Sequence, residues 1–450
     1  MKPYPEKTAC RALTEQLELY AQLQHEYGAS GIRPVLRRAE RDLKAALARL
    51  RALPPDAGLA AREPNGLAAI QALRPRGPRR LWPAFDAAAY RDRIEGAWLG
   101  RMAGCTLGAP VEFWDVEAMA NLARENGTAF PPDDYWTRVP DPFRKRYETS
   151  PRAAYTRDKM NGVPADDDIA YTLLGLLIVE EYGPRFTVED VGKAWLRYLP
   201  FACTAERVAL DNLKAGVPAR KAGAKDNPYC EWIGADIRAD PWGYLAPGWP
   251  ERAAAMAWQD AYLSHRRQGV YGEMYFAAAI AAAFAVDDTV EALRIGLTEI
   301  PRDCALAKAV RWALGQAPRI RTWRQARATA EKKFAGMHRV HTIINACLTV
   351  WGITIGKTDF SRVIGETVAM GLDNDCTAAT AGSIVGAVVG KKDIPPRWTR
   401  NFNNTIHSYL TGKRRFTISG TLTRFARQAK RVHDETAGQG GEGEEVTSGQ

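Results

Sequence analysis

Two short runs of acidic residues are the strongest chemical signal in the sequence. Asp166, Asp167 and Asp168 are consecutive and precede an apolar segment, and Asp373 and Asp375 precede a segment of small, apolar residues. A single aspartate before a helix is explained by capping, because its carboxylate accepts hydrogen bonds from free backbone N–H groups. Adjacent carboxylates, however, repel one another unless a cation or strong donors lie nearby. The two runs together therefore favour a metal site.

The type of ligand indicates which ion would bind. Carboxylate oxygens without neighbouring His or Cys suit Mg²⁺, Mn²⁺ or Ca²⁺ and suit Zn²⁺ poorly. The 6 histidines contain no His-Glu-x-x-His pair, and no Gly-x-Ser-x-Gly motif of a serine nucleophile is present. The 7 cysteines are scattered singly, which predicts reduced thiols rather than a disulfide framework or a zinc site.

Helices must position these acidic residues. The composition of residues 169–182, 251–264, 273–286 and 376–389 predicts α-helices, and an all-α fold is expected. Glycines recur at every fourth position in two further patterns, which are Gly100, Gly104 and Gly108, and Gly382, Gly386 and Gly390. Because a glycine inside a helix costs about 0.8–1 kcal/mol relative to alanine, this spacing predicts two helices whose backbones pack closely.

The net charge of +10 is unevenly distributed over the 450 residues. Residues 1–90 hold 15 Lys and Arg against 9 Asp and Glu, and residues 413–450 hold 7 against 5. The segment between them is therefore nearly neutral, which argues against a nucleic-acid-binding core. The longest nearly apolar run, residues 275–286, is too short for a bilayer that needs roughly 20 residues. With no signal-peptide pattern, the sequence predicts a cytoplasmic protein without a membrane segment.

Four segments together resemble the ADP-ribosylglycohydrolase family, of the dinitrogenase reductase-activating glycohydrolase type. They are residues 93–112, 165–172, 263–280 and 371–382, and they occur in the family's order. The resemblance implies an orthogonal multi-helix bundle with two magnesium ions in a central cleft. It also implies hydrolysis of the bond that joins ADP-ribose to a protein side chain, a nucleic acid or a small molecule.

The resemblance assigns roles to particular residues. The implied metal ligands are Asp166, Asp167, Asp168, Asp373, Asp375 and Thr377, the implied catalytic residues are Glu112 and Asp168, and the implied substrate contacts are His265, Gly269, Tyr271 and Gly272. The sequence departs from the family pattern at Cys105, where an Asp is common, at Cys376, where Thr or Ser is usual, and at Asp166 and Ile169, where Thr is usual. A thiol is a poor magnesium ligand, so these departures are expected to alter the affinity of the metal site for its cation.

Three parts of the chain are expected. The sequence of residues 1–85 predicts a basic, helical extension and linker with amphipathic helices at 10–27 and 33–53. Residues 86–412 would form the ADP-ribosylglycohydrolase-like catalytic domain. The composition of residues 413–450 predicts a tail that is first basic and then Gly/Glu-rich. We expect it to be partly disordered, above all at 438–450.

Other functions stay open at this point. A module that binds ADP-ribose without cleaving it is favoured if Cys105 and Cys376 disable the site, and a structural role on the same fold is a further alternative. Nucleic acid is a possible partner through the basic extensions. The aromatic residues Trp232, Trp242, Tyr244 and Trp249 predict either a stacking surface for adenine or ordinary packing. The sequence determines neither the acceptor nor the oligomeric state.

Overall fold

The structure is a computed structural model that describes Tyr4 and residues 8–437. The Gly/Glu-rich segment 438–450, which was expected to be disordered, lies outside the described residues. The chain divides into two compact units. The smaller unit comprises residues 1–61 and 335–337, and the larger unit comprises residues 62–334 and 338–450.

The smaller unit is a helical hairpin. Helix α1 (Thr8–Glu26) packs against α2 (Ile32–Arg51), and α3 (Ala57–Arg62) follows. The turn between α1 and α2 contains Gly28 and Gly31, whose φ angles of 74° and 90° favour glycine. The predicted hairpin is therefore present. Its apolar residues are substantially exposed, for example Leu43 and Leu47.

The larger unit is built almost entirely from helices. Its α-helices are α4 (Leu67–Ala72), α5 (Ala87–Gly108), α6 (Val116–Asn126), α7 (Asp167–Tyr182), α8 (Val188–Tyr198), α9 (Thr204–Lys214), α10 (Ala219–Ala222), α11 (Asp240–Leu245), α12 (Pro250–Ala261), α13 (Gln268–Ala283), α14 (Thr289–Gly296), α15 (Ala305–Gln316), α16 (Trp323–Lys333), α17 (Thr342–Gly356), α18 (Phe360–Ala369), α19 (Asn374–Val389) and α20 (Ile418–Ala437). Short 3-10 helices are η1 (Ala109–Val111), η2 (Arg152–Tyr155), η3 (Ile233–Arg238), η4 (Leu297–Glu299), η5 (Ala317–Arg319), η6 (Lys391–Asp393) and η7 (Pro396–Trp398).

Strands play a minor part in this unit. Strand β1 (Lys145–Arg146) pairs antiparallel with β2 (Ser150–Pro151), and β3 (Thr405–His407) pairs antiparallel with β4 (Arg415–Thr417). The predicted all-α class is confirmed. The four helices predicted over 169–182, 251–264, 273–286 and 376–389 correspond to α7, α12, α13 and α19.

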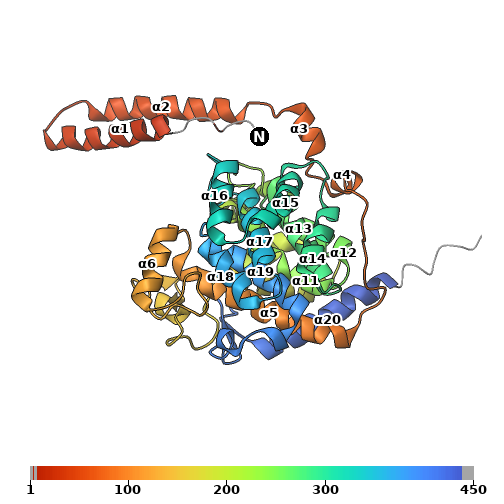
Figure 1. The fold of residues 1–450 in the computed structure, drawn as a ribbon. Coiled ribbons are helices and arrows are strands. Elements are labelled where there is room, and N and C mark those ends of the chain that lie inside the picture. The colour runs from red at the N-terminus through yellow and green to blue at the C-terminus, as the bar shows by residue number, and fades with distance from the viewer. Residues whose placement is uncertain (1–3, 5–7, 438–450) are drawn as a thin grey trace, which may run out of the picture. The chain divides into compact units, whose positions relative to one another are not determined.

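Helices α5 and α19 form the closest contact in the core, and they lie side by side in Figure 1. A Cβ added to Gly100 would overlap the carbonyl oxygen of Gly382 and lie 2.8 Å from its carbonyl carbon. A Cβ on Gly104 would lie 2.9 Å from the amide nitrogen of Ala379. These glycines are needed because the two backbones touch. The predicted close packing of the two glycine patterns is confirmed.

The larger unit extends beyond residues 86–412 at both ends. Glu63 and Ile70 are buried in it, and the Glu63 carboxylate pairs with Arg267. At the other end, α20 buries Phe425 and pairs Arg424 with Glu180 at 2.5 Å. The basic face of α20 is therefore partly engaged within the unit.

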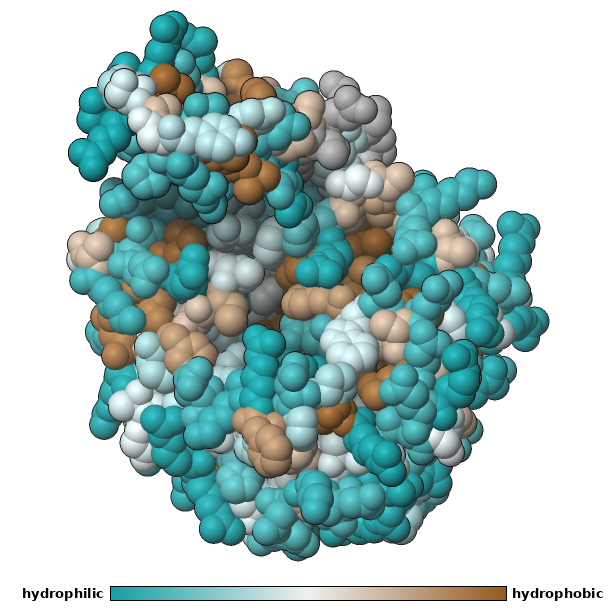
Figure 2. Space-filling model, turned by 90° about the vertical axis from the view of Figure 1, so that its left-hand side faces the viewer, coloured by the Kyte–Doolittle hydropathy of each residue, from teal (hydrophilic) through white to brown (hydrophobic). Residues whose placement is uncertain are grey.

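The surface in Figure 2 is dominated by hydrophilic side chains, and hydrophobic residues occur on it in small groups. Among the described residues, every helix is too short or too polar to cross a lipid bilayer.

Candidate functional site

Acidic residues of both sequence motifs line one cavity of about 410 Å³, with the exception of Asp166. Its acidic lining residues are Glu112, Asp167, Asp168, Glu206, Asp373 and Asp375. Carboxylate oxygens of Glu112, Asp373 and Asp375 lie within 4.8 Å of one another. Ligand atoms of Cys105, Asp166 and Asp168 form a second group of the same size. The predicted convergence of the two motifs is confirmed.

Helix ends place these side chains. Asp166 caps α7 and accepts a hydrogen bond from the backbone N–H of Asp168 at 3.2 Å. Asp373 precedes α19, Asp375 lies in its first turn, and Glu112 follows the 3-10 helix η1. The positive ends of two helix dipoles thus face the cavity, and they favour negative charge there. Because α5 and α19 touch through their glycines, Cys105 and Asp375 belong to one rigid framework.

Burial concentrates the repulsion between these carboxylates. It raises the pKa of Asp168, Asp373 and Asp375 well above the ordinary range, and nearby carboxylates add to the effect. Burial also raises the pKa of Glu112, and it raises that of Asp166 to about 7 although Arg146 opposes the shift. A positive charge is needed to keep such a group ionised.

Arg146 supplies part of that charge. Its Nη1 donates to Glu112 Oε2 at 2.9 Å and to the carbonyl oxygen of Ala109 at 2.8 Å. Its Nη2 donates to Asp166 Oδ2 and to Asp375 Oδ2, both at 3.0 Å. One guanidinium therefore bridges carboxylates from both motifs.

Arg101 neutralises the deepest carboxylate. This fully buried side chain donates to Asp168 Oδ1 at 3.1 Å, to Asp240 Oδ2 at 2.7 Å and to Thr172 Oγ1 at 2.7 Å. Asp168 is only 2% exposed. Because it is also paired with Arg101, it is not available as a free carboxylate.

The two groups differ in how well they fit a hard divalent cation. Glu112, Asp373 and Asp375 offer carboxylate oxygens, which Mg²⁺ prefers. Asp373 forms no ion pair with any described residue, and its nearest charged neighbours are negative. The second group contains the Cys105 thiol, whose pKa is raised by burial, and a protonated thiol is a poor ligand for Mg²⁺. The residues therefore fit one such cation better than two.

Several residues implied by the family resemblance lie away from this cavity. His265 is fully buried, and its Nδ1 is 2.8 Å from Ser264 Oγ. Tyr271 donates to the carbonyl oxygen of Pro64 at 2.5 Å, and Gly269 and Gly272 are packed inside α13. None of the four lines the cavity. The segment that contains these four residues instead packs around the buried guanidinium of Arg238, whose hydrogen bonds hold neighbouring side chains of the segment in place.

Thr377, the implied replacement for a metal-binding hydroxyl, is also buried outside the cavity lining. Its Oγ1 has no hydrogen-bond partner among the described residues. Asp167, by contrast, lines the cavity, and its Oδ1 accepts a hydrogen bond from Tyr147 at 2.6 Å.

Of the four aromatic residues considered for adenine stacking, only Trp232 lines the cavity. Its ring stacks on His338 with the centroids 4.1 Å apart and the planes 9° from parallel. Trp242 and Tyr244 are buried in the core. Trp249 instead packs on His433 and beneath Arg80.

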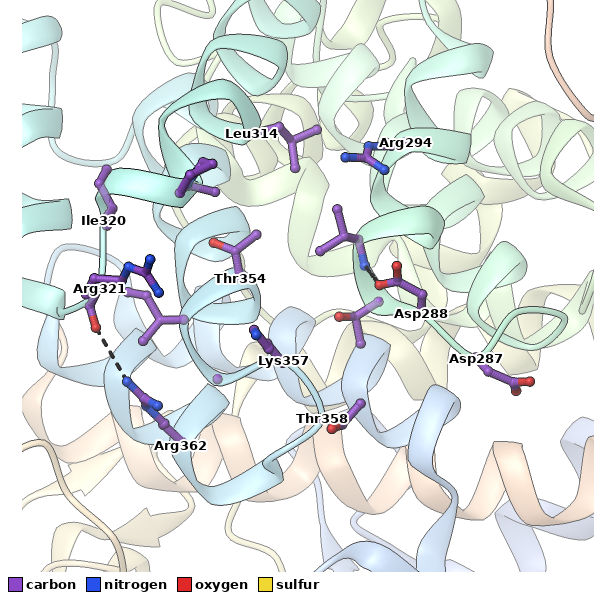
Figure 3. A pocket seen from close by; sticks show the side chains of 16 residues that line it. Asp287, Asp288, Arg294, Leu314, Ile320, Arg321, Thr354, Lys357, Thr358 and Arg362 are labelled. Carbon is purple, nitrogen blue, oxygen red and sulfur yellow. Dashed lines mark hydrogen bonds between the residues drawn. The ribbon is translucent and has the colours of Figure 1, made fainter.

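A second hollow, of about 740 Å³, has the opposite charge (Figure 3). Arg294, Arg321, Lys357 and Arg362 line it, and Arg362 donates to the carbonyl oxygen of Arg321 at 3.5 Å. Its two aspartates are engaged elsewhere, since Asp287 pairs with Arg93 and Asp288 caps α14. It shares no lining residue with the acidic cavity, and it lacks free carboxylates for hydrolysis.

Sequence reasoning missed Arg146, Arg101 and Tyr147. Arg101 lies between glycines of the first pattern. Its place on a helix that is predicted to pack closely could have indicated that its side chain is buried. Arg146 and Tyr147 lie in a hairpin without periodicity, which offered no such signal.

Comparisons with known proteins agree with the fold and the motifs. The sequence model of the family described as ADP-ribosylglycohydrolase matches residues 86–439. A solved structure described as "ADP-ribosylglycohydrolase-related protein complex" is similar to this fold with a TM-score of 0.50 and 20% sequence identity, covering 77% of this chain and 99% of that one. No curated protein matches the chain in a sequence search.

Proposed function

Because the chain belongs to the ADP-ribosylglycohydrolase family, we propose that it hydrolyses the glycosidic bond between ADP-ribose and an acceptor in the acidic cavity. The observation that carries the proposal is the convergence of Glu112, Asp373 and Asp375 within 4.8 Å at the wall of a cavity. Cleaving a bond to ribose develops positive charge at the anomeric carbon. A cavity rich in carboxylates stabilises that charge.

Glu112 is the preferred candidate to position the attacking water. Its side chain is 23% exposed, whereas that of Asp168 is 2% exposed and paired with Arg101. Burial raises the pKa of Glu112, and the neighbouring Arg146 opposes the shift. Arg146 fixes the orientation of the Glu112 carboxylate through its hydrogen bond at 2.9 Å.

Magnesium is the proposed cation, and Glu112, Asp373 and Asp375 would hold it. Such an ion, when bound, orients ribose hydroxyls and lowers the pKa of water. The half-buried carboxylate of Asp167 and the stacked rings of Trp232 and His338, which line the cavity, would contact the ADP-ribose part of the substrate. Arginine, serine and nucleobase conjugates all present the same ribose to these residues, so the test compares all three acceptors.

The test uses the full chain with Mg²⁺ and a panel of arginine-, serine- and nucleic-acid-linked ADP-ribose conjugates. Mass spectrometry would detect free ADP-ribose. Asp373→Asn and Asp375→Asn should each lower the rate at least 100-fold, while Asp303→Asn, an exposed aspartate before α15, should keep it. Undiminished hydrolysis by the double variant Asp373→Asn/Asp375→Asn would contradict the proposal.

Binding of ADP-ribose without cleavage is the second candidate, and the thiol at Cys105 favours it. The same panel separates the two functions. A binding module would retain the intact conjugate with a measurable Kd and release no ADP-ribose, whether or not Mg²⁺ is present.

Nucleic acid remains a proposed partner through the basic helix α2, whose Arg33, Arg37, Arg38 and Arg41 are exposed. Binding to a single-stranded oligonucleotide should weaken steeply between 50 and 200 mM salt if several phosphate contacts form, as expected from about one counterion per contact. A salt-independent signal would exclude this partner.

A further inference from the structure

A clamped hairpin holds the side chain of Arg146 against Glu112 and Asp375, two of the residues that line the acidic cavity. The β1–β2 turn places Tyr147 and Glu148 at φ angles of 49° and 52°, a left-handed conformation that costs non-glycine residues of order 1–3 kcal/mol. The ring of Tyr147 stacks on Phe201 and Tyr409, with centroids 6.0 and 5.2 Å away. The guanidinium of Arg146 is only 16% exposed. It is therefore a fixed part of the cavity and not a mobile surface group.

The hairpin has two further anchors. The Tyr147 hydroxyl donates to Asp167 Oδ1 at 2.6 Å, and Ser150 Oγ accepts from the backbone N–H of Ala165 at 2.9 Å. Both anchors join the hairpin to the segment that begins α7. The turn thus delivers Arg146 to the same acidic run that its guanidinium contacts.

The contacts of Arg146 are those expected of a bound cation. Its two terminal nitrogens reach three carboxylates, those of Glu112, Asp166 and Asp375, at 2.9–3.0 Å. The three come from the end of η1, the start of α7 and the start of α19. In this structure a guanidinium joins carboxylates from both motifs.

Arginine also neutralises the remaining carboxylate of the second group. Asp168 pairs with Arg101 at 3.1 Å, and Arg101 is held by Asp240 at 2.7 Å. Both carboxylates of the Cys105, Asp166 and Asp168 group thus have arginine partners. In the other group, Glu112 and Asp375 share Arg146 with Asp166, whereas Asp373 forms no ion pair within the described part of the chain and has only carboxylates as charged neighbours.

We propose that Arg146 and Arg101 take the place of one cation of a two-cation site, so that the chain binds a single divalent cation at Glu112, Asp373 and Asp375. The proposal depends on the proposed function only in taking the acidic cavity as the place where a cation binds. It replaces the sequence-based expectation of two magnesium ions. It also makes Arg146 a positioning residue, since it orients Glu112 and Asp375 toward the remaining cation.

The test counts bound ions and does not require activity. The full chain is titrated with Mn²⁺, and free Mn²⁺ is followed by electron paramagnetic resonance, with calorimetry as a second measure. We expect one ion per chain for the wild type. Asp373→Asn should weaken its binding at least tenfold. Asp166→Asn should leave one ion with an affinity within about threefold, because Asp166, unlike Glu112, Asp373 and Asp375, does not line the cavity in which the ion would bind.

Variants of Arg146 separate charge from packing. Because Arg101 still neutralises Asp168 when Arg146 is removed, Arg146→Met should free Asp166 alone and keep one ion, and Arg146→Lys should also keep one ion; only the double variant Arg146→Met/Arg101→Met, if it folds, should raise the stoichiometry to two. Arg294→Met is the matched control, because it removes an exposed arginine in the separate basic hollow. Circular dichroism shows whether each variant is folded, and the wild type and Asp166→Asn decide the matter if Arg146→Met does not fold.

Two ions on the wild type, or loss of the ion from Asp166→Asn, would overturn the inference. Failure of the proposed function is a different result. One bound ion with no conjugate hydrolysed would leave the inference intact and remove the hydrolase, and hydrolysis with two bound ions would do the reverse.

Discussion

Gly100 and Gly382 face each other so closely that neither position accommodates a methyl group. A Cβ on Gly382 would overlap the carbonyl oxygen of Gly100 and lie 2.9 Å from its carbonyl carbon. Both obstacles are backbone atoms, so relief requires the two helices to move apart. Since α5 and α19 carry Glu112 and Asp375 to the cavity, this contact sets the geometry of the site.

Gly382→Ala is therefore expected to destabilise the fold by about 2–4 kcal/mol, through overpacking at the helix contact. Urea unfolding followed by circular dichroism measures the change. Gly315→Ala is the matched control, since Gly315 is also helical but has no atom within 4 Å of a would-be Cβ. There the better helix propensity of alanine should add up to about 1 kcal/mol. Equal effects at the two positions would contradict the packing argument.

Arg101→Met should be among the most damaging substitutions away from the helix contact. It would leave Asp168 and Asp240 buried without their counterion, which typically costs about 3–5 kcal/mol. Adding Asp240→Asn should restore part of the loss, because one uncompensated charge is removed. A double-mutant cycle of unfolding free energies tests this, and strict additivity would show that the ion pair contributes nothing.

The buried carboxylate of Glu206 predicts a pH dependence of stability. Burial raises its pKa to about 7 although Arg238 opposes the shift. The folded state then binds more protons than the unfolded state between about pH 4.5 and 7, so stability falls as pH rises through this window. Glu206→Gln should remove a loss on the order of 3 kcal/mol.

Unfolding with EDTA at pH 5 and pH 8 measures this effect as the difference between wild type and variant. Glu117→Gln, on the exposed face of α6, should leave the wild-type pH profile unchanged. A Glu206→Gln variant with the full wild-type slope would assign the effect to another group.

A divalent cation should stabilise the folded chain. Binding to the folded state alone contributes about 2.7 kcal/mol when the cation is present at 100 times its Kd. The melting temperature should therefore rise with Mg²⁺ or Mn²⁺ and return to its starting value with EDTA. Sodium chloride at equal ionic strength is the control, and Asp373→Asn should respond to neither ion.

The sequence identified the parts of the site that follow from local rules. Aspartates before apolar segments predicted Asp166 and Asp373 at helix starts, and the glycine spacing predicted the contact between α5 and α19. It could not predict Arg146, because a hairpin side chain is directed by distant partners such as Tyr409 and Phe201. For the same reason it could not predict that His265 is fully buried and does not line the cavity. Its orientation is set by burial beside Ser264 and Arg238.

The hairpin arginine also bears on how the chain is made. Asp375 lies 229 positions after Arg146, which corresponds to roughly 10–45 s of ribosomal synthesis at about 5–20 residues per second. During that interval Glu112 and Asp166 have already emerged while α19 has not. A tethered guanidinium can neutralise them at once, without any ion being captured from the cell. The first half of the nascent chain thus contains its own counter-charge until α19, which completes the cavity, has been synthesised.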